Sequence, residues 1–345
     1  MPPELRLQLK PDSIAVLKNQ IKKNAEGSPQ QVTAYVRLVQ LLVASAAPDA
    51  GEYTNELVRI LEQLRTKVPP IGKNEFTVLY EQSVKDAASL EIVPAMLWLA
   101  ENANPSEAYG LFLRAANLGD SYAMMKLGRL CLRKGTEADD QEGFRWLEKA
   151  YAAPKPNLEA GAFIADCYLS GKGTTQNVQK AEEIVTPLAN QNVVPAMTLA
   201  GRILQYRADI KRSEAAGNGN PQLRKKLEAE ADELDRQARR WWERAEKDDW
   251  NASAHLGKCY EEGWGGEKNE AEAEKRYKAG ASHGNALSMF LYGLFLEKKP
   301  GHRSETESLM VRAAAMGLPS AIKWCKENSV PIQETKADDL RRRNR

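Results

Sequence analysis

The chain has 345 residues, 42% of them hydrophobic, enough to bury a sizeable core in several domains or in one long repeat array. The 49 Lys and Arg residues nearly balance the 47 Asp and Glu residues, so the net charge of +2 gives no strong field favouring nucleic acid or a membrane surface. No apolar run is long enough to span a bilayer. The start, Met1-Pro2-Pro3-Glu4, lacks the pattern of a secretory signal, which favours a cytoplasmic protein, or a periplasmic or secreted one if a signal has been removed.

The first 90 residues show helical periodicity without a clean repeat. Proline- and glycine-containing breaks separate the periodic stretches, because these residues favour turns. The pattern predicts helices over 12–24, 29–46, 51–67 and 74–88. Terminal parts of a helical array must present a polar outer face, so we expect residues 1–90 to form an N-terminal helical cap.

From residue 95 onward one spacing recurs about every 36 residues. A small residue is followed four positions later by an apolar residue, then by a small residue, and three positions further on by an aromatic or aliphatic one. Clear copies begin at Ala123, Ala160, Ala196, Ala252 and Ser288. At 100° per residue the apolar positions share one face of a helix, so each copy predicts the first helix of a two-helix unit.

A second helix pattern and a glycine loop complete each unit. The second helix pairs small residues with an aromatic side chain, as in Gly143-Phe144-Arg145-Trp146-Leu147. The loop is clearest at Ser170-Gly171-Lys172-Gly173 and Glu262-Gly263-Trp264-Gly265. These residues together resemble the Sel-one-like repeat (SLR) family, a relative of the tetratricopeptide arrays. The resemblance covers roughly residues 95 to 325.

The resemblance implies an all-α fold, an α/α solenoid of stacked antiparallel helix pairs, over residues 91–329. It also implies a non-enzymatic scaffold whose first helices line a concave surface. Some members of the family staple each repeat with a disulfide, which requires two cysteines per unit. This chain departs from that subtype, because Cys131, Cys167 and Cys259 have no partner within their units.

One step of the repeat is about 20 residues longer than the others. The first helix that begins near Ala196 continues past the usual end, and Gly217-Asn218-Gly219-Asn220-Pro221 then forms a turn. We expect an αα-hairpin insertion over about 205–237. The small and apolar residues of its second helix predict a packing seam. They are Leu223, Leu227, Ala231, Leu234, Ala238, Trp241 and Ala245, expected to pack near Tyr206 and Ile210.

No residue pattern points to catalysis, a cofactor or a metal. The four cysteines occupy positions that other units fill with apolar residues, so we expect free, buried thiols. Neither a zinc-type cysteine cluster nor a Ser/His/Asp or HExxH context occurs. The glycine loops lack the Lys-Ser/Thr of a phosphate-binding loop and suit turns with positive φ. His255 corresponds to Phe163 and Leu199 of other units, which favours a groove-lining or half-buried position.

The candidate partner-binding residues come from the helix faces that point away from the core. Positions two and six residues after the first small residue lie about 200° and 240° round the helix. These positions predict a partner-binding groove with a charged stripe beside small and apolar residues. The alternative is that they form a face that is simply solvated. The candidates are Met125, Arg129, Asp166, Arg202, Lys258 and Phe290.

The leading hypothesis is a non-enzymatic scaffold or adaptor that binds protein partners through the concave first-helix surface and the hairpin. The alternative is a binder of nucleic acid or another anionic polymer, using the hairpin and a basic tail over 330–345 that we expect to be disordered. The balanced charge of the hairpin disfavours nucleic acid. No transmembrane segment is expected, and attachment to a membrane-bound complex stays open.

Overall fold

The computed structural model describes residues 12–26, 28–44, 50–67 and 84–332, which form helices joined by turns and loops, without strands. The chain divides into two compact units, with the boundary between Ala160 and Gly161. The all-α class and the solenoid of stacked helix pairs are thus confirmed. Among the described helices, none combines the length and the apolar composition needed to cross a membrane.

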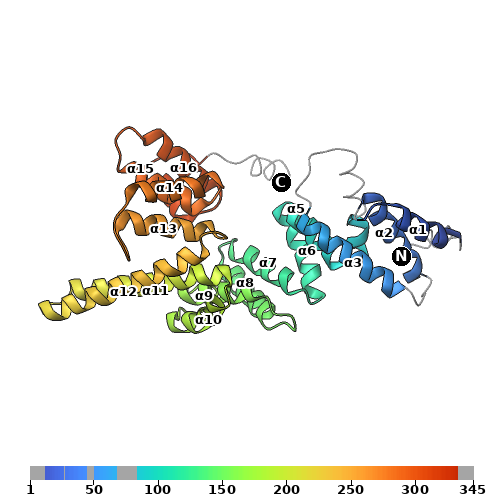
Figure 1. Cartoon of the computed structure of the whole chain (residues 1–345), viewed down its shortest axis with the longest axis horizontal. Coiled ribbons are helices and arrows are strands. Elements are labelled where there is room, and N and C mark those ends of the chain that lie inside the picture. Colours follow the sequence, from blue (N-terminus) through green and yellow to red (C-terminus); the bar gives the residue numbers. More distant parts are fainter. Residues whose placement is uncertain (1–11, 27, 45–49, 68–83, 333–345) are drawn as a thin grey trace. The chain divides into compact units, whose positions relative to one another are not determined.

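The first unit begins with three helices close to their predicted positions and continues with antiparallel helix pairs (Figure 1). Residues 84–89 are also helical, and the start of the helix predicted over 74–88 lies outside the described residues. The helices are α1 Asp12–Lys23, α2 Pro29–Ala44, α3 Ala50–Lys67, α5 Val93–Asn102, α6 Pro105–Asn117, α7 Ser121–Leu132 and α8 Glu137–Tyr151. The role of residues 1–90 as a cap stays a prediction.

The second unit stacks four helix pairs and ends on a single helix. α9 starts at the end of the first unit and continues into the second. The helices are α9 Leu158–Ser170, α10 Val178–Asn190, α11 Val194–Ala216, α12 Pro221–Ala245, α13 Trp250–Glu262, α14 Glu270–Ser282, α15 Ala286–Glu297, α16 Arg303–Ala315 and α17 Pro319–Glu327. α17 buries Ala321 and Cys325 as the first helix of a half-repeat, and Val330 and Ile332 pack on the same core. The tail predicted to be disordered otherwise lies outside the described residues.

Small residues on one helix of a pair let the partner helix approach closely. Gly257 of α13 faces the ring of Tyr277 on α14, and Gly201 of α11 faces Trp242 on α12. Both aromatic side chains are fully buried. The pattern of a small residue opposite an aromatic one is therefore what holds the two helices of a pair together.

Glycines with positive φ follow several second helices, where L-residues with side chains rarely adopt the conformation needed to end the helix. Gly119, Gly284 and Gly317 have φ of 90°, 81° and 85°. All four cysteines are free and buried, which confirms the expectation from their repeat positions.

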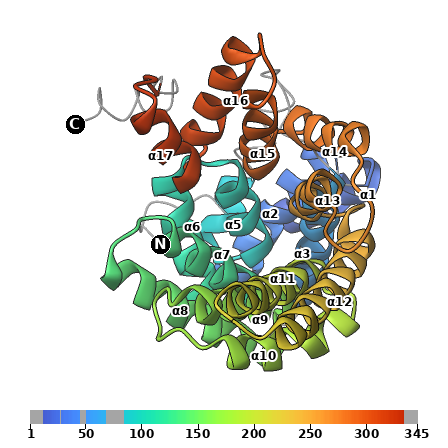
Figure 2. The ribbon, with the colours of Figure 1, turned by 90° about the vertical axis from the view of Figure 1, so that its left-hand side faces the viewer.

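The predicted hairpin is present as α11 and α12, which lie side by side (Figures 1 and 2) and project beyond the neighbouring pairs (Figure 1). The predicted seam is wrong in part, because Leu223, Tyr206 and Ile210 are each about 40% exposed. The buried positions are Ala208, Ala215, Leu227, Ala231, Asp235, Ala238, Trp242 and Ala245. Alanines fill the seam because they let the two long helices approach more closely than large side chains would.

The seam of α12 is shifted by one residue at two positions, and a charged pair occupies one of them. Asp235, only 2% exposed, lies where Leu234 was predicted and forms an ion pair with Arg212 of α11. A buried carboxylate requires such a partner. Trp242 likewise turns inward in place of Trp241, because Gly201 leaves room for its ring, whereas Ala238 and Ala245 are buried as predicted.

We predict that Gly257→Ala destabilises the second unit. The added methyl group would lie 2.6 Å from Cε1 of Tyr277, and overpacking of this kind costs about 1–3 kcal/mol. Urea unfolding of the variant measures the loss. Gly219→Ala is the control, because nothing lies within 4 Å of that position. Equal unfolding midpoints for both variants would show that the close approach is not a constraint.

Candidate functional site

A groove of about 500 Å³ runs across the first helices of the second unit. It is lined by Ala162, Phe163, Asp166, Pro195, Thr198, Leu199, Arg202, Asp249, Asn251, His255, Leu287 and Leu318. α9, α11 and α13 supply most of these residues. Six of the twelve residues are apolar and six are polar or charged, so the groove offers both apolar contacts and hydrogen-bonding groups to a ligand.

Trp242 supports the floor of the groove. Its ring stacks on His255 with 4.8 Å between ring centroids and 12° between planes. Its indole N–H donates to the Thr198 carbonyl at 3.1 Å, and the Thr198 hydroxyl donates to Asp249 at 2.7 Å. Asp249 caps α13 by accepting from the Asn251 backbone N–H at 2.8 Å. These contacts tie α11, α12 and α13 together beneath the groove.

The charged pair of the groove joins two neighbouring repeats. The Arg202 guanidinium on α11 lies 2.7 Å from the Asp166 carboxylate on α9, and each side chain keeps more than two fifths of its surface exposed. Such an exposed pair contributes little to stability. Both groups therefore remain available to a ligand that lies across them.

His255 is neutral in the groove. Burial disfavours its charged form, and the nearby Arg202 guanidinium opposes a second positive charge, so the pKa of His255 falls to about 3. A neutral imidazole offers one N–H donor and one acceptor nitrogen. At pH 7, His255 thus presents hydrogen-bonding groups without charge.

The structure brings together two of the six predicted site residues, Asp166 and Arg202. Met125 is buried at 1% exposure, and Arg129 is half-buried on α7 of the first unit. Lys258 instead pairs with Glu262 at 2.6 Å, outside the groove-lining set. Phe290 packs against the core of the last repeats and does not line the groove.

The sequence analysis placed His255 at a groove-lining or half-buried position, as found, but left Phe163, Leu199 and Asn251 off the candidate site. Phe163, Leu199 and His255 lie three residues after the first small residue of their units, about 300° round the helix. Asn251 lies one residue before it, at about 260°. The groove-lining positions therefore cover an arc of about 200° to 300° round the helix. The positions two and six residues after the first small residue, which the sequence analysis selected, cover only part of this arc.

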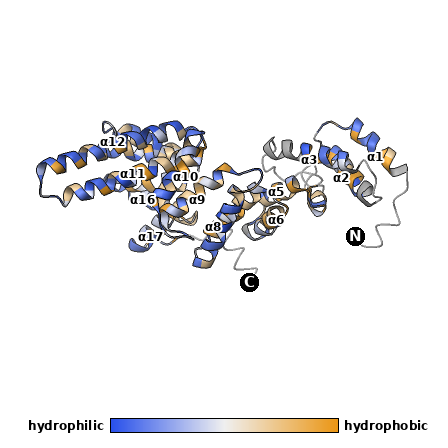
Figure 3. Cartoon of the chain, turned by 90° about the horizontal axis from the view of Figure 1, so that it is seen from below, coloured by the Kyte–Doolittle hydropathy of each residue, from blue (hydrophilic) through white to orange (hydrophobic). Residues whose placement is uncertain are grey.

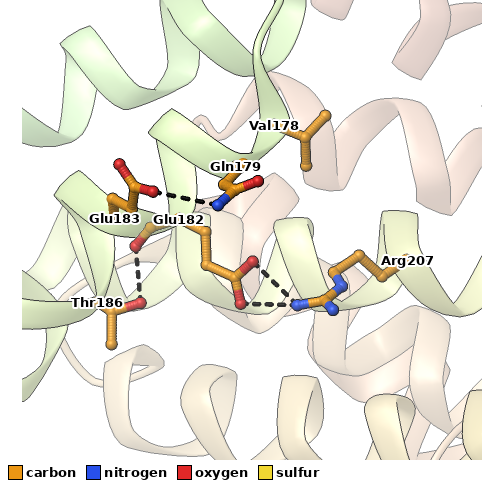
Figure 4. A pocket seen from close by; sticks show the side chains of 6 residues that line it. All are labelled: Val178, Gln179, Glu182, Glu183, Thr186 and Arg207. Carbon is orange, nitrogen blue, oxygen red and sulfur yellow. Dashed lines mark hydrogen bonds and ion pairs between the residues drawn. The ribbon is translucent and has the colours of Figure 1, made fainter.

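A second concavity, of about 660 Å³, lies on α10 and α11 (Figure 4). Arg207 contacts both carboxylate oxygens of Glu182 at 2.8 and 2.9 Å, and Gln179 donates to Glu183 at 3.3 Å. The lining polar groups thus bind one another. Val178 is the one purely hydrocarbon side chain that lines it, so this concavity offers less to a ligand than the groove.

The described residues contain no group of three or more His, Cys, Asp or Glu side chains that could hold a metal ion.

Five segments of the chain match the sequence profile of the Sel1 repeat, the repeat of the SLR family: residues 99–120, 121–154, 159–192, 231–248 and 250–285. The chain therefore contains five Sel1 repeats, which confirms the resemblance. The unmatched stretch between 192 and 231 contains most of the hairpin insertion. Sel1-repeat proteins are generally non-catalytic scaffolds for protein interactions. No curated protein sequence matches the chain.

Solved structures similar to the chain include a Sel1 repeat protein from Oxalobacter formigenes, with 17% identity, a TM-score of 0.44, and coverage of 91% of this chain and 86% of that one. A protective antigen with an SLR fold from uropathogenic Escherichia coli has 19% identity, a TM-score of 0.38, and coverage of 82% and 65%. A monomeric IFIT1 mutant with a capped RNA has 13% identity, a TM-score of 0.40, and coverage of 90% and 84%. At these TM-scores none of the three supports an inference about function.

We predict that His255 makes the fold sensitive to acid. The unfolded chain protonates this residue near pH 6.5 and the folded chain only near pH 3. The unfolded state therefore binds more protons between these values, and stability falls as the pH falls. From pH 7 to pH 5 this group should account for a loss of about 2 kcal/mol. Urea unfolding at both pH values should show a smaller loss in His255→Phe, and equal losses in the two proteins would contradict the prediction.

Proposed function

We propose that this chain is a non-enzymatic scaffold that holds a protein partner in the groove of the second unit. The observation that carries the proposal is the groove itself, to which successive repeats contribute apolar side chains and an equal number of polar or charged ones. Its floor is held by the Trp242 contacts to His255 and Thr198. A partner would therefore meet a preorganised surface, which lowers the entropic cost of binding.

The hairpin is the second proposed contact surface. Its projecting part is mostly hydrophilic (Figure 3), yet it carries the large apolar side chains of Tyr206, Ile210 and Leu223, each about 40% exposed. Exposed apolar groups on a projecting element suit contact with another protein. The alternative is an insertion that projects harmlessly into solvent.

The ion pairs of the hairpin argue against the nucleic-acid alternative. Several of its basic side chains bind neighbouring carboxylates, whereas no ion pair to a described residue is formed by Arg224, Lys225 or Lys226. The pairs are Lys211 with Glu214 and Glu230, Arg212 with Asp209, Asp232 and Asp235, Arg236 with Glu233, and Arg239 with Glu243. Binding of a polyanion relies on basic groups free to replace its counterions. The basic tail beyond residue 332 lies outside the described residues.

The groove is tested by site-specific photo-crosslinking in cells of the source organism. We expect Asn251→p-benzoylphenylalanine, whose side chain lies in the groove, to give a discrete partner adduct. Lys275→p-benzoylphenylalanine is the control, because Lys275 is 75% exposed on α14, outside the groove. An adduct at both positions, or at neither, would contradict the proposal. Mass spectrometry of the adduct identifies the partner.

The hairpin is tested with the partner so identified. The triple variant Tyr206→Ala, Ile210→Ala and Leu223→Ala should bind at least about tenfold more weakly, since interface anchors each contribute about 1 kcal/mol or more. Its unfolding midpoint should hardly change, because all three side chains are already half exposed in the free chain. Leu118→Ala and Met316→Ala are controls with similar exposure elsewhere. Unchanged affinity of the triple variant would favour the insertion that projects harmlessly.

A further inference from the structure

Asn218 and Gly219 lie at the tip of the hairpin, in the turn between α11 and α12. An asparagine side chain can lose its amide nitrogen when the backbone nitrogen of the next residue attacks the side-chain carbonyl carbon, because the two atoms are close enough to close a five-membered ring. Glycine obstructs this approach least. Nothing lies within 4 Å of the position that a side chain at Gly219 would take, so the tip is open to ring closure.

The backbone nitrogen of Gly219 is prepared for such an attack. Its N–H donates no hydrogen bond to a described residue, so its proton can pass to hydroxide in the solvent. The resulting anion shares its charge with the carbonyl oxygen of Asn218, which belongs to the same peptide group. Arg224 of α12 donates from Nη2 to this oxygen at 3.0 Å. A permanently charged guanidinium at this place stabilises the anion and favours loss of the proton.

The side-chain carbonyl of Asn218 is held in place as the group that is attacked. Its Oδ1 accepts a hydrogen bond from the Asn220 backbone N–H at 2.9 Å. When the Gly219 nitrogen bonds to Cγ, negative charge moves to Oδ1, where this N–H stabilises it as an oxyanion donor. Asn220 also caps α12 by accepting from the Gln222 N–H at 3.0 Å, which fixes the first turn and with it Arg224.

We propose that Asn218 is a site of intramolecular deamidation, promoted by Arg224 and by the Asn220 N–H. The Gly219 nitrogen forms a bond to Cγ of Asn218, and the bond between Cγ and Nδ2 breaks as ammonia leaves with a proton taken from water. Water then opens the cyclic imide, at Cγ to give aspartate or at the main-chain carbonyl carbon to give isoaspartate. One amide and one water molecule thus become one carboxylate and one ammonium ion. This inference does not rest on the proposed function.

The reaction changes the charge of the hairpin tip. Arg224, Lys225 and Lys226 form no ion pair with a described residue, and the new carboxylate adds a negative charge beside them. The carboxylate also lies near the positive end of the α12 dipole, where negative charge is stabilised. Leu223, which is 40% exposed, follows on the first turn of α12. A surface that carries this side chain therefore gains an acidic neighbour as the protein molecule ages.

The proposal is tested on the purified full chain, incubated at mildly alkaline pH beside a capped synthetic peptide of residues 214–226, which is too short to hold the turn. Peptide mapping by mass spectrometry follows the change from amide to acid at Asn218. We expect the folded chain to react about tenfold faster than the peptide, because only the fold places both donors. Asn220 is an internal control, since Pro221 offers no N–H for the same attack. No reaction at Asn218, or a rate no faster than that of the peptide, would overturn the proposal.

A matched pair of variants tests the role of Arg224. Arg224→Gln removes the charged donor and should slow the reaction of the folded chain about tenfold, with little effect in the peptide. Lys225→Gln is the control, because it removes the same charge from the neighbouring exposed residue, which donates no hydrogen bond to the described turn. Its rate should stay within about twofold of the original. Equal rates of the two variants would overturn the assignment of Arg224.

Discussion

The structure of the second unit depends on the close approach of two helices at a glycine. Gly201 of α11 has no side chain, and the ring of Trp242 from α12 occupies that space. The same ring then reaches two further elements, because it stacks on His255 of α13 and donates to the Thr198 carbonyl. A side chain at position 201 would displace Trp242, and with it the support of the groove floor. Packing and site geometry are thus one constraint.

The same constraint explains why the groove is uncharged at its floor. Stacking on Trp242 half-buries His255, and burial beside Arg202 keeps its imidazole neutral. The repeats provide Phe163 and Leu199 at the equivalent positions of α9 and α11. His255 is therefore a polar substitution at a repeat position that otherwise carries an apolar side chain.

Much of the fold could be predicted from sequence periodicity. The helix pairs, the hairpin and the buried thiols could be predicted from the spacing of residues along the chain, because every copy of the repeat must bury the same apolar positions against its neighbours. The groove was predicted less well. Which residues line it depends on how successive helices are tilted, and the spacing within one helix does not contain that information. Met125 and Asp166 are both on faces predicted to point outward, yet Met125 is buried and Asp166 lines the groove.

The buried residues of the hairpin seam could also not be predicted fully from the spacing of apolar residues. A search for apolar residues at heptad-like spacing selects Leu234, whereas the buried residue is the neighbouring Asp235 with its partner Arg212. An ion pair across two helices is a relation between distant positions, and a periodic pattern within one helix cannot reveal it. Asp235 also lies where the glycine loop of the next repeat approaches, since a side chain at Gly265 would meet the Asp235 carbonyl.

The continuity of α11 joins the two proposed contact surfaces. Residues 198, 199 and 202 of this helix line the groove, and the same helix continues without a break to Ala216 in the hairpin. Its position is held at one end by Trp242 and further along by Asp235. A partner that contacts both surfaces therefore meets two sites at a fixed separation. The second contact then forms at a high effective concentration, so two weak contacts can together give stable binding. In this view the insertion adds a second contact surface to the repeat that lines the groove. Because α11 carries both surfaces, this one helix sets the orientation of the bound partner.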